Sequence, residues 1–160
     1  MATPLHVYLN DHRSGATMGT ALSRKLRSRF EGTDRGPFFT QLAGDIEADA
    51  DALSALMASL QVRRNALKQA SGWAAEKVSR LKLNRWFNGS ERLTVLLEIE
   101  ALALGVEGKL SLWLGLQAVA DSRPELKAAP LDELAARAEE QRTGLEQERL
   151  REAEAVLRLS

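Results

Sequence analysis

Apolar residues recur along most of this chain at intervals of three, four and seven positions, which is the spacing of amphipathic helices. The first such stretch covers residues 4–30, with Thr3 as N-cap and Pro4 at the first helical position, where proline is favoured. Residues 31–37 contain two glycines and a proline and interrupt the pattern. A second helix is predicted over about residues 37–60.

Two further helices are predicted in the second half of the chain. One begins near Asn88, which forms a capping-box pattern with Glu91, and runs to about residue 120. The other follows Pro130, with acidic residues in its first turn. A long crossover, about residues 61–89, separates the second helix from the third and contains a shorter helical pattern.

This order of elements predicts an all-α protein. No stretch shows the sustained alternation of β-branched residues that is typical of strands. Two short links and one long crossover favour a four-helix bundle with an up-down-down-up order, formed as a single domain by residues 1–160.

The composition of the chain excludes several kinds of functional site. The chain has no cysteine, which excludes a disulfide framework, a thiolate zinc site, an iron–sulfur cluster and a cysteine nucleophile. It shows no apolar run long enough to cross a bilayer and no secretory signal, so we expect a soluble cytoplasmic protein without a transmembrane segment. Lys+Arg and Asp+Glu balance at 22 each. The one concentrated charge feature is a basic stretch over residues 63–89.

Each predicted helix carries a polar side chain where its apolar stripe should face the interior. Extending the stripes through their gaps places a histidine on the first helix, acids on the second and third, and an amide on the fourth. Asp11, Glu98 and Glu140 are alternatives beside these positions. The inward set is His12, Glu47, Asp49, Glu100, Glu107 and Gln141.

Two helical hairpins, a long crossover and mid-helix carboxylates resemble the ferritin-like superfamily. The strings that carry the resemblance to bacterial members of this fold are YLNDH at 8–12, EAD at 47–49, LEIE at 97–100 and LGVEGK at 104–109. The resemblance implies a bundle that holds two irons through a Glu from each of two helices and Glu-x-x-His from each of the other two. This chain departs from that rule, because both of its histidines, His6 and His12, lie on the first helix.

Two interpretations of the inward polar residues therefore stay open. In the first, they form a metal site with fewer ligands than a di-iron centre, which holds one iron, manganese or zinc ion around His12 and Glu100. In the second, they form a metal-free hydrogen-bonded network in which His12 pairs with Glu100 or Asp49. The missing ligands favour the network, with no metal cofactor.

Pairs of glycines interrupt two of the helices. Gly15 and Gly19 lie one turn apart on the first helix, and Gly105 and Gly108 lie on the third. Each costs about 1 kcal/mol against alanine inside a helix. Either they allow close packing of helices or of a bulky neighbour such as Trp113, or they leave room for a ligand beside His12 and Glu107.

The crossover combines cations with aromatic residues. Such a mixture is able to bind nucleic acid or an anionic surface, or alternatively to cover the bundle with its apolar side chains and leave the cations in water. The candidate surface residues are Lys77, Arg80, Lys82, Arg85 and Trp86.

The sequence thus predicts a structural or interaction module rather than an enzyme, and no catalytic residue is assigned. A metal-binding protein or oxidase, and binding of nucleic acid through the crossover, are the alternatives. Apolar residues in the charge-rich last helix, among them Leu150 and Leu157, suggest contact with a second copy or with another protein partner.

Overall fold

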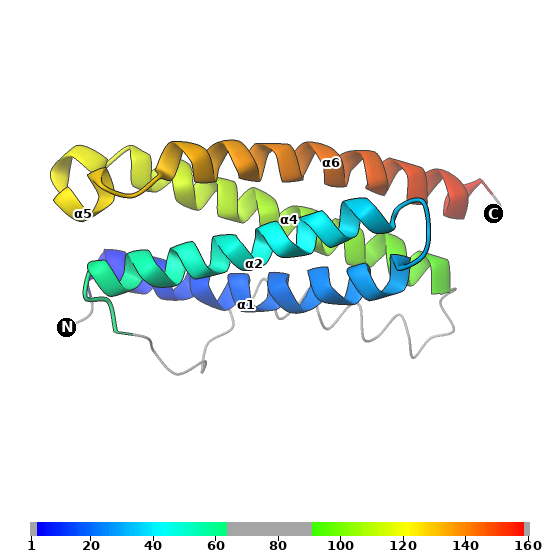
Figure 1. Cartoon of the computed structure of the whole chain (residues 1–160), viewed down its shortest axis with the longest axis horizontal. Helices are drawn as coiled ribbons and strands as arrows, with labels where there is room; N and C mark the ends of the chain where they lie inside the picture. The colour runs from blue at the N-terminus through cyan, green and yellow to red at the C-terminus, as the bar shows by residue number, and fades with distance from the viewer. Residues whose placement is uncertain (1–2, 64–90, 159–160) are drawn as a thin grey trace.

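The computed structural model describes residues 3–63 and 91–158. Within these ranges the chain forms helices joined by short turns and contains no strand, which confirms the all-α prediction. The helices are α1 (Pro4–Phe30), α2 (Gly36–Ser59), α4 (Glu91–Gln117), the 3-10 turn η1 (Ala120–Ser122), α5 (Pro124–Lys127) and α6 (Leu131–Leu157) (Figure 1). None of the helices in this part of the chain is apolar enough over its length to span a membrane.

The start of α1 is fixed as the sequence predicts. The Thr3 hydroxyl accepts a hydrogen bond from the backbone N–H of His6 at 3.3 Å, and Pro4 occupies the first helical position. This cap satisfies a backbone donor that the first turn of a helix leaves without a partner.

A tight turn joins α1 to α2 and is held by one buried cation. A Cβ atom at Gly36 would lie 2.8 Å from the carbonyl oxygen of Phe30, so only glycine fits the turn. The guanidinium of Arg35 lies 4.1 Å from the centre of the Phe30 ring and pairs with Glu148 and Glu152 of α6. The turn is thereby tied to the far end of the last helix.

The link between α4 and α6 is more ordered than the sequence predicts. It contains η1 and the single-turn helix α5, which place the fully buried side chain of Leu126 against the core. Proline at the start of α5 explains the new turn, because its fixed φ angle suits a first helical position.

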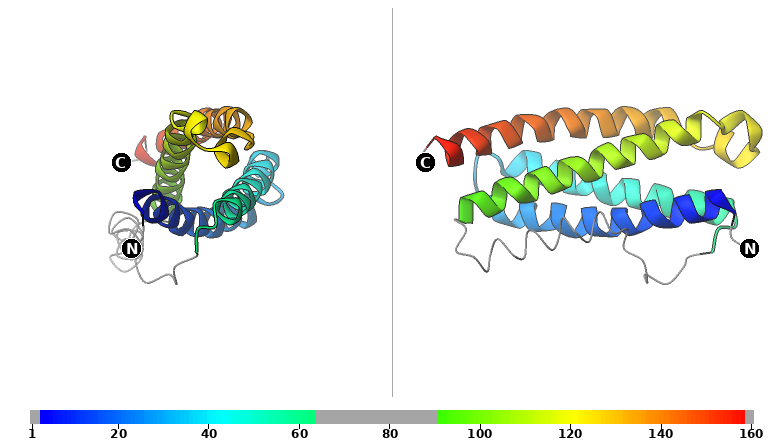
Figure 2. Two further views of the ribbon diagram at one scale, coloured as in Figure 1. Left: turned by 90° about the vertical axis from the view of Figure 1, so that its left-hand side faces the viewer. Right: turned by 180° about the vertical axis from the view of Figure 1, so that it is seen from behind.

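The four long helices lie around a common axis, and neighbours run antiparallel (Figures 1 and 2). The helix α1 packs against α2 and α4, and α4 also packs against α6. The backbones of α2 and α6 approach each other at few points. Long polar side chains bridge this fourth seam, with Arg35 at one end and Asp49 near the middle.

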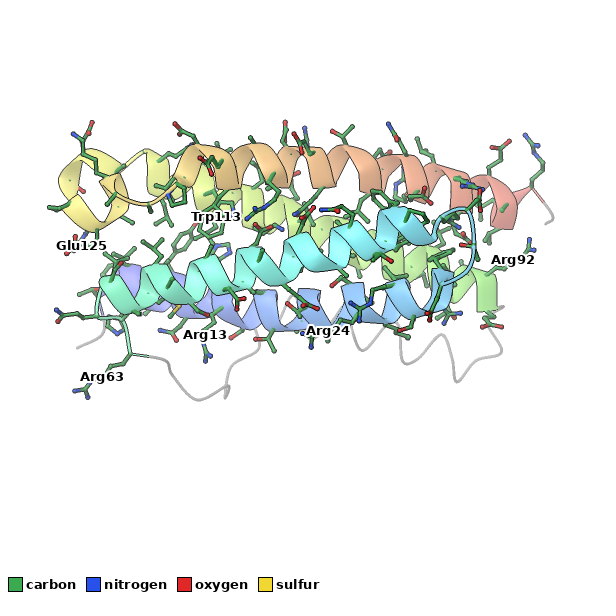
Figure 3. All side chains as sticks on the ribbon, viewed as in Figure 1. Arg13, Arg24, Arg63, Arg92, Trp113 and Glu125 are labelled. Carbon is green, nitrogen blue, oxygen red and sulfur yellow. The ribbon has the colours of Figure 1, made fainter. Side chains whose placement is uncertain are left out.

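The apolar core consists of two clusters along the axis. One contains Leu9, Leu53 and Trp113, and the other contains Phe30, Ile46 and Leu145. Trp113 is fully buried and lies inside the bundle (Figure 3). On α2 and on α6 the residue between the two clusters is polar, Asp49 and Gln141 respectively, and both are buried.

The inward face of α4 differs from the predicted one. The buried residues include Val95, Ile99, Leu102, Val106 and Trp113, whereas the predicted stripe contained Glu100, Glu107 and Leu114. That stripe was right at Leu96 and Leu110, which are buried, and wrong at its two acids and Leu114, because α4 contacts both α1 and α6. A helix with two packed faces is apolar around much of its circumference, so its periodicity does not define one inward direction.

Candidate functional site

The centre of the bundle holds a polar cluster built around the carboxylate of Asp49. Arg137 donates two hydrogen bonds to Asp49 Oδ1, the one from Nε at 2.7 Å. Gln141 Nε2 donates to Asp49 Oδ2 at 3.0 Å, and Lys109 Nζ donates to the same oxygen. A carboxylate offers about four acceptor positions. All four of those on Asp49 are used by the protein itself.

The amide of Gln141 and the ammonium of Lys109 complete the Asp49 cluster. Gln141 Oε1 accepts a hydrogen bond from Lys109, so the amide uses a donor and its acceptor within the same group of side chains. Burial lowers the pKa of Lys109, and the nearby carboxylate of Asp49 opposes that shift. One carboxylate faces two cations, so the cluster carries a net positive charge when all three groups are ionised.

The structure brings only some of the predicted inward residues together. Asp49 and Gln141 are buried and hydrogen-bonded to each other. The partners found for Asp49 and Glu100 within the described residues are, however, residues other than His12. His12 is half-buried, and its ring lies 4.6 Å from the ring of Tyr8 in an edge-on contact. Burial lowers the pKa of His12, and the neighbouring charge of Asp11 raises it by less.

Three predicted acids lie at the surface instead of in the interior. Glu47 pairs with Arg24 of α1 at 2.6 Å. Glu100 lies 3.6 Å from Arg149. Glu107 is about half exposed and lies 3.7 Å from Arg142. These three assignments to the inward site were wrong, because each side chain projects from the rim of its helix toward a cation on a neighbouring helix.

The buried carboxylate of α4 is Glu98, which the sequence offered only as an alternative. Its side chain is 2% exposed, and Lys25 of α1 donates to its Oε1 atom. Arg29 Nε lies 3.8 Å from Oε2, too far for a hydrogen bond. The Oε2 atom is buried without a hydrogen-bond partner. A buried carboxylate oxygen in this state is costly.

A groove of about 840 Å³ runs between α1 and α4 and reaches inward to His12 and Asp49. Its walls are mostly apolar, and the buried side of Glu98 also lines it. The four glycines singled out by the sequence all lie on its walls: Gly15, Gly19, Gly105 and Gly108. At each of them, an added Cβ would meet no described atom within 4 Å, so packing against the described helices does not require these glycines.

The basic surface predicted at Lys77, Arg80, Lys82, Arg85 and Trp86 lies outside the described residues. The same holds for the Asn88 cap of α4.

Sequence reasoning missed Lys109 and Arg137, although a signal for each is present. The stripe Val95, Ile99, Leu102 and Val106 continues after three residues at Lys109. Arg137 lies one turn before Gln141 on α6. Choosing the other inward face of α4 would have placed an ammonium, and not a carboxylate, at the centre.

Within residues 3–63 and 91–158, no group of three or more His, Asp or Glu side chains is arranged to hold a metal ion. Comparison of the chain with protein-family models, with curated proteins and with solved structures found no match in any of the three.

Proposed function

We propose that this chain is a ferritin-like bundle with an up-down-down-up order that acts as a structural or interaction module and has no functional di-iron centre. The observation that carries this proposal is the filled coordination of Asp49. Its oxygens accept four hydrogen bonds from Arg137, Lys109 and Gln141. A metal ligand must have a free lone pair, and a net positive site repels a divalent cation.

In this proposal Lys109 supplies the positive charge that metal ions supply in the middle of an iron-binding bundle. It lies between α2 and α6, bonded to Asp49 and Gln141. The cluster then joins three helices without any cofactor.

Elemental analysis of untagged protein purified without chelator tests the absence of a metal centre. Cells are grown with added iron, manganese and zinc, and wild type is compared with His12→Ala. We expect far less than one equivalent of any of these metals in both proteins. About one equivalent of metal in wild type that is lost from His12→Ala would overturn the proposal in favour of the single-ion site around His12 and Glu100, since imidazole would then be a required ligand.

The interaction part of the proposal concerns a second copy of the chain. Its support is the C-terminal half of α6, where Leu150 and Leu157 are 53% and 60% exposed. Light scattering after size exclusion measures the mass. A dimer that becomes a monomer in Leu150→Lys supports this part, with Arg151→Lys as the control, and a monomeric wild type contradicts it.

A further inference from the structure

The four seams between neighbouring helices of the bundle are not built alike. Along three of them, α1 with α2, α1 with α4 and α4 with α6, the helix backbones pack closely, whereas α2 and α6 approach each other at few points. The helices α2 and α6 are nevertheless neighbours around the axis, as the end-on view of Figure 2 shows. The bundle therefore consists of two helical hairpins, α1–α2 and α4–α6, that adjoin along α1 and α4. Backbone packing does not close the fourth seam.

Ion pairs with buried partners cross the α2–α6 seam at two places. At one end, Arg35 pairs with Glu148 and Glu152, and each of the three side chains is at most 15% exposed. Near the middle, Asp49 accepts hydrogen bonds from Arg137, whose side chain is 35% exposed. Water therefore already reaches one partner of the central pair while the seam is closed.

These ion pairs hold the seam less firmly than apolar packing of the same extent would. Removing two opposite charges from water costs about as much free energy as their attraction returns, so a buried pair adds little net stability. When the seam opens, both partners of each pair return to water together, and no charge is left buried without a partner. Opening the seam therefore costs much less free energy than deleting one partner by mutation.

An aromatic ring is also seated in the α2–α6 seam. The ring of Phe38 on α2 lies against α6 at Gly144, where an added Cβ would be 2.5 Å from the ring atom Cε2. Phe38 is only partly buried. Glycine at position 144 lets the two helices close over the ring, and a methyl group in its place would hold them apart.

We propose that the α2–α6 seam is the opening edge of the bundle. The hairpins α1–α2 and α4–α6 part at this edge and stay joined through α1 and α4. The ion pairs of Arg35 and Asp49 fix the closed geometry and become hydrated in the open state. Opening exposes the inner apolar side of both hairpins, where Ile46 and Leu145 lie, without unfolding a helix. This inference does not depend on the proposed function or on whether the Asp49 cluster binds metal.

Single cysteines test which seam opens, because the chain has no native cysteine. Ala138→Cys and Ala43→Cys each place a thiol where the alanine is 0% exposed. Ala138 shares the inward side of α6 with Gln141, three residues further on. Ala43 lies one turn before Glu47, whose pair with Arg24 crosses the α1–α2 seam. Under native conditions, we expect an aromatic disulfide reagent to label the Ala138→Cys variant about tenfold faster than the Ala43→Cys variant, since opening of the α2–α6 seam exposes only the first thiol.

Urea denaturation of each variant gives the labelling rate that complete unfolding alone would produce. Equal labelling of the two thiols, or labelling of both at the rate set by complete unfolding, would overturn the proposal. Faster labelling of the Ala43→Cys variant would also overturn it, because the α1–α2 seam would then be the one that opens. If circular dichroism shows that the Ala138→Cys variant does not fold, Leu42→Cys takes its place. Leu42 is buried two turns before Asp49, on the side of α2 that faces α6.

A methyl group inserted into the seam gives a second test. In the Ala138→Cys background, Gly144→Ala places a Cβ against the Phe38 ring, whereas the control Gly44→Ala adds the same group on α2 where it meets no described atom. We expect Gly144→Ala to raise the labelling rate about tenfold and Gly44→Ala to leave it unchanged. Adding Phe38→Leu removes the ring atoms in contact and should reverse most of the increase. The same labelling rate with Gly144→Ala as with Gly44→Ala would contradict the proposal.

Discussion

The helix α4 has two sides that handle buried charge in different ways. Toward α2 and α6, Lys109 joins Asp49 and Gln141 in a cluster where the carboxylate accepts four hydrogen bonds. Toward α1, Glu98 is equally buried, yet one of its oxygens has no hydrogen-bond partner, and glycines leave the wall beside it open. The first side is complete within the described helices. The second retains a buried carboxylate oxygen without a donor, which costs free energy.

The largest effect is expected from Asp49→Asn. This change removes the negative charge that is hydrogen-bonded to Lys109 and Arg137 while keeping the size of the side chain. Breaking a buried ion pair leaves an uncompensated charge, and about 3 kcal/mol of the free energy of unfolding should be lost. Urea denaturation measures the loss. Glu47→Gln, which affects the exposed pair with Arg24 on the same helix, should leave the midpoint unchanged. Similar midpoints for the two variants would mean that the cluster does not hold the helices together.

A slightly smaller effect is expected from Arg35→Ala. The variant loses two ion pairs with buried or nearly buried acids and the contact with the Phe30 ring. We expect thermal and urea unfolding to show a loss of about 2–3 kcal/mol. The matched control is Arg151→Ala, whose pair with Asp34 joins the same turn to α6 but lies at the surface. A comparable loss in both variants would show that burial of Arg35 contributes nothing.

Alanine in place of glycine distinguishes the two sides of the molecule more finely. Gly44→Ala on the exposed face of α2 should raise the free energy of unfolding by about 0.5–1 kcal/mol, because alanine is the better helix former. Gly105→Ala should gain a similar amount, because a Cβ at this groove position also meets no described atom within 4 Å. A smaller gain at Gly105 in denaturant unfolding would show that a group other than the described residues contacts this wall of the groove.

The smallest effect is expected from pH. Burial places the pKa of His12 below its ordinary value of 6.5. The unfolded chain therefore binds more protons at this position as pH falls from about 7, and the folded state loses stability until the pH is below the lowered pKa. Substituting His12→Gln should flatten this part of the stability profile. An imidazole titrating above 6.5 by proton NMR, assigned by comparison with His12→Gln, would contradict the shift.

The helices could be predicted from the sequence because caps and breakers are local signals. Thr3, Pro4 and the glycine-rich turn fix the ends of the first hairpin without reference to any distant residue. The inward polar residues were predicted correctly only on helices with one dominant apolar face. Asp49 on α2 and Gln141 on α6 are examples. On α4, contacts with two neighbouring helices leave no single apolar face, so the periodicity did not indicate that Lys109 points inward.

The position of the Asp49 cluster between two apolar clusters has a consequence for helix register. Leucines, alanines and aromatic side chains tolerate exchange of neighbours, so a helix shifted by one turn would bury nearly as much apolar surface. A shift of about 5.4 Å would, however, separate Arg137 and Gln141 from Asp49 and leave buried charges unmatched. The polar layer therefore selects one alignment of α6 against α2 where their backbones have little contact, as a single buried polar residue does in coiled coils.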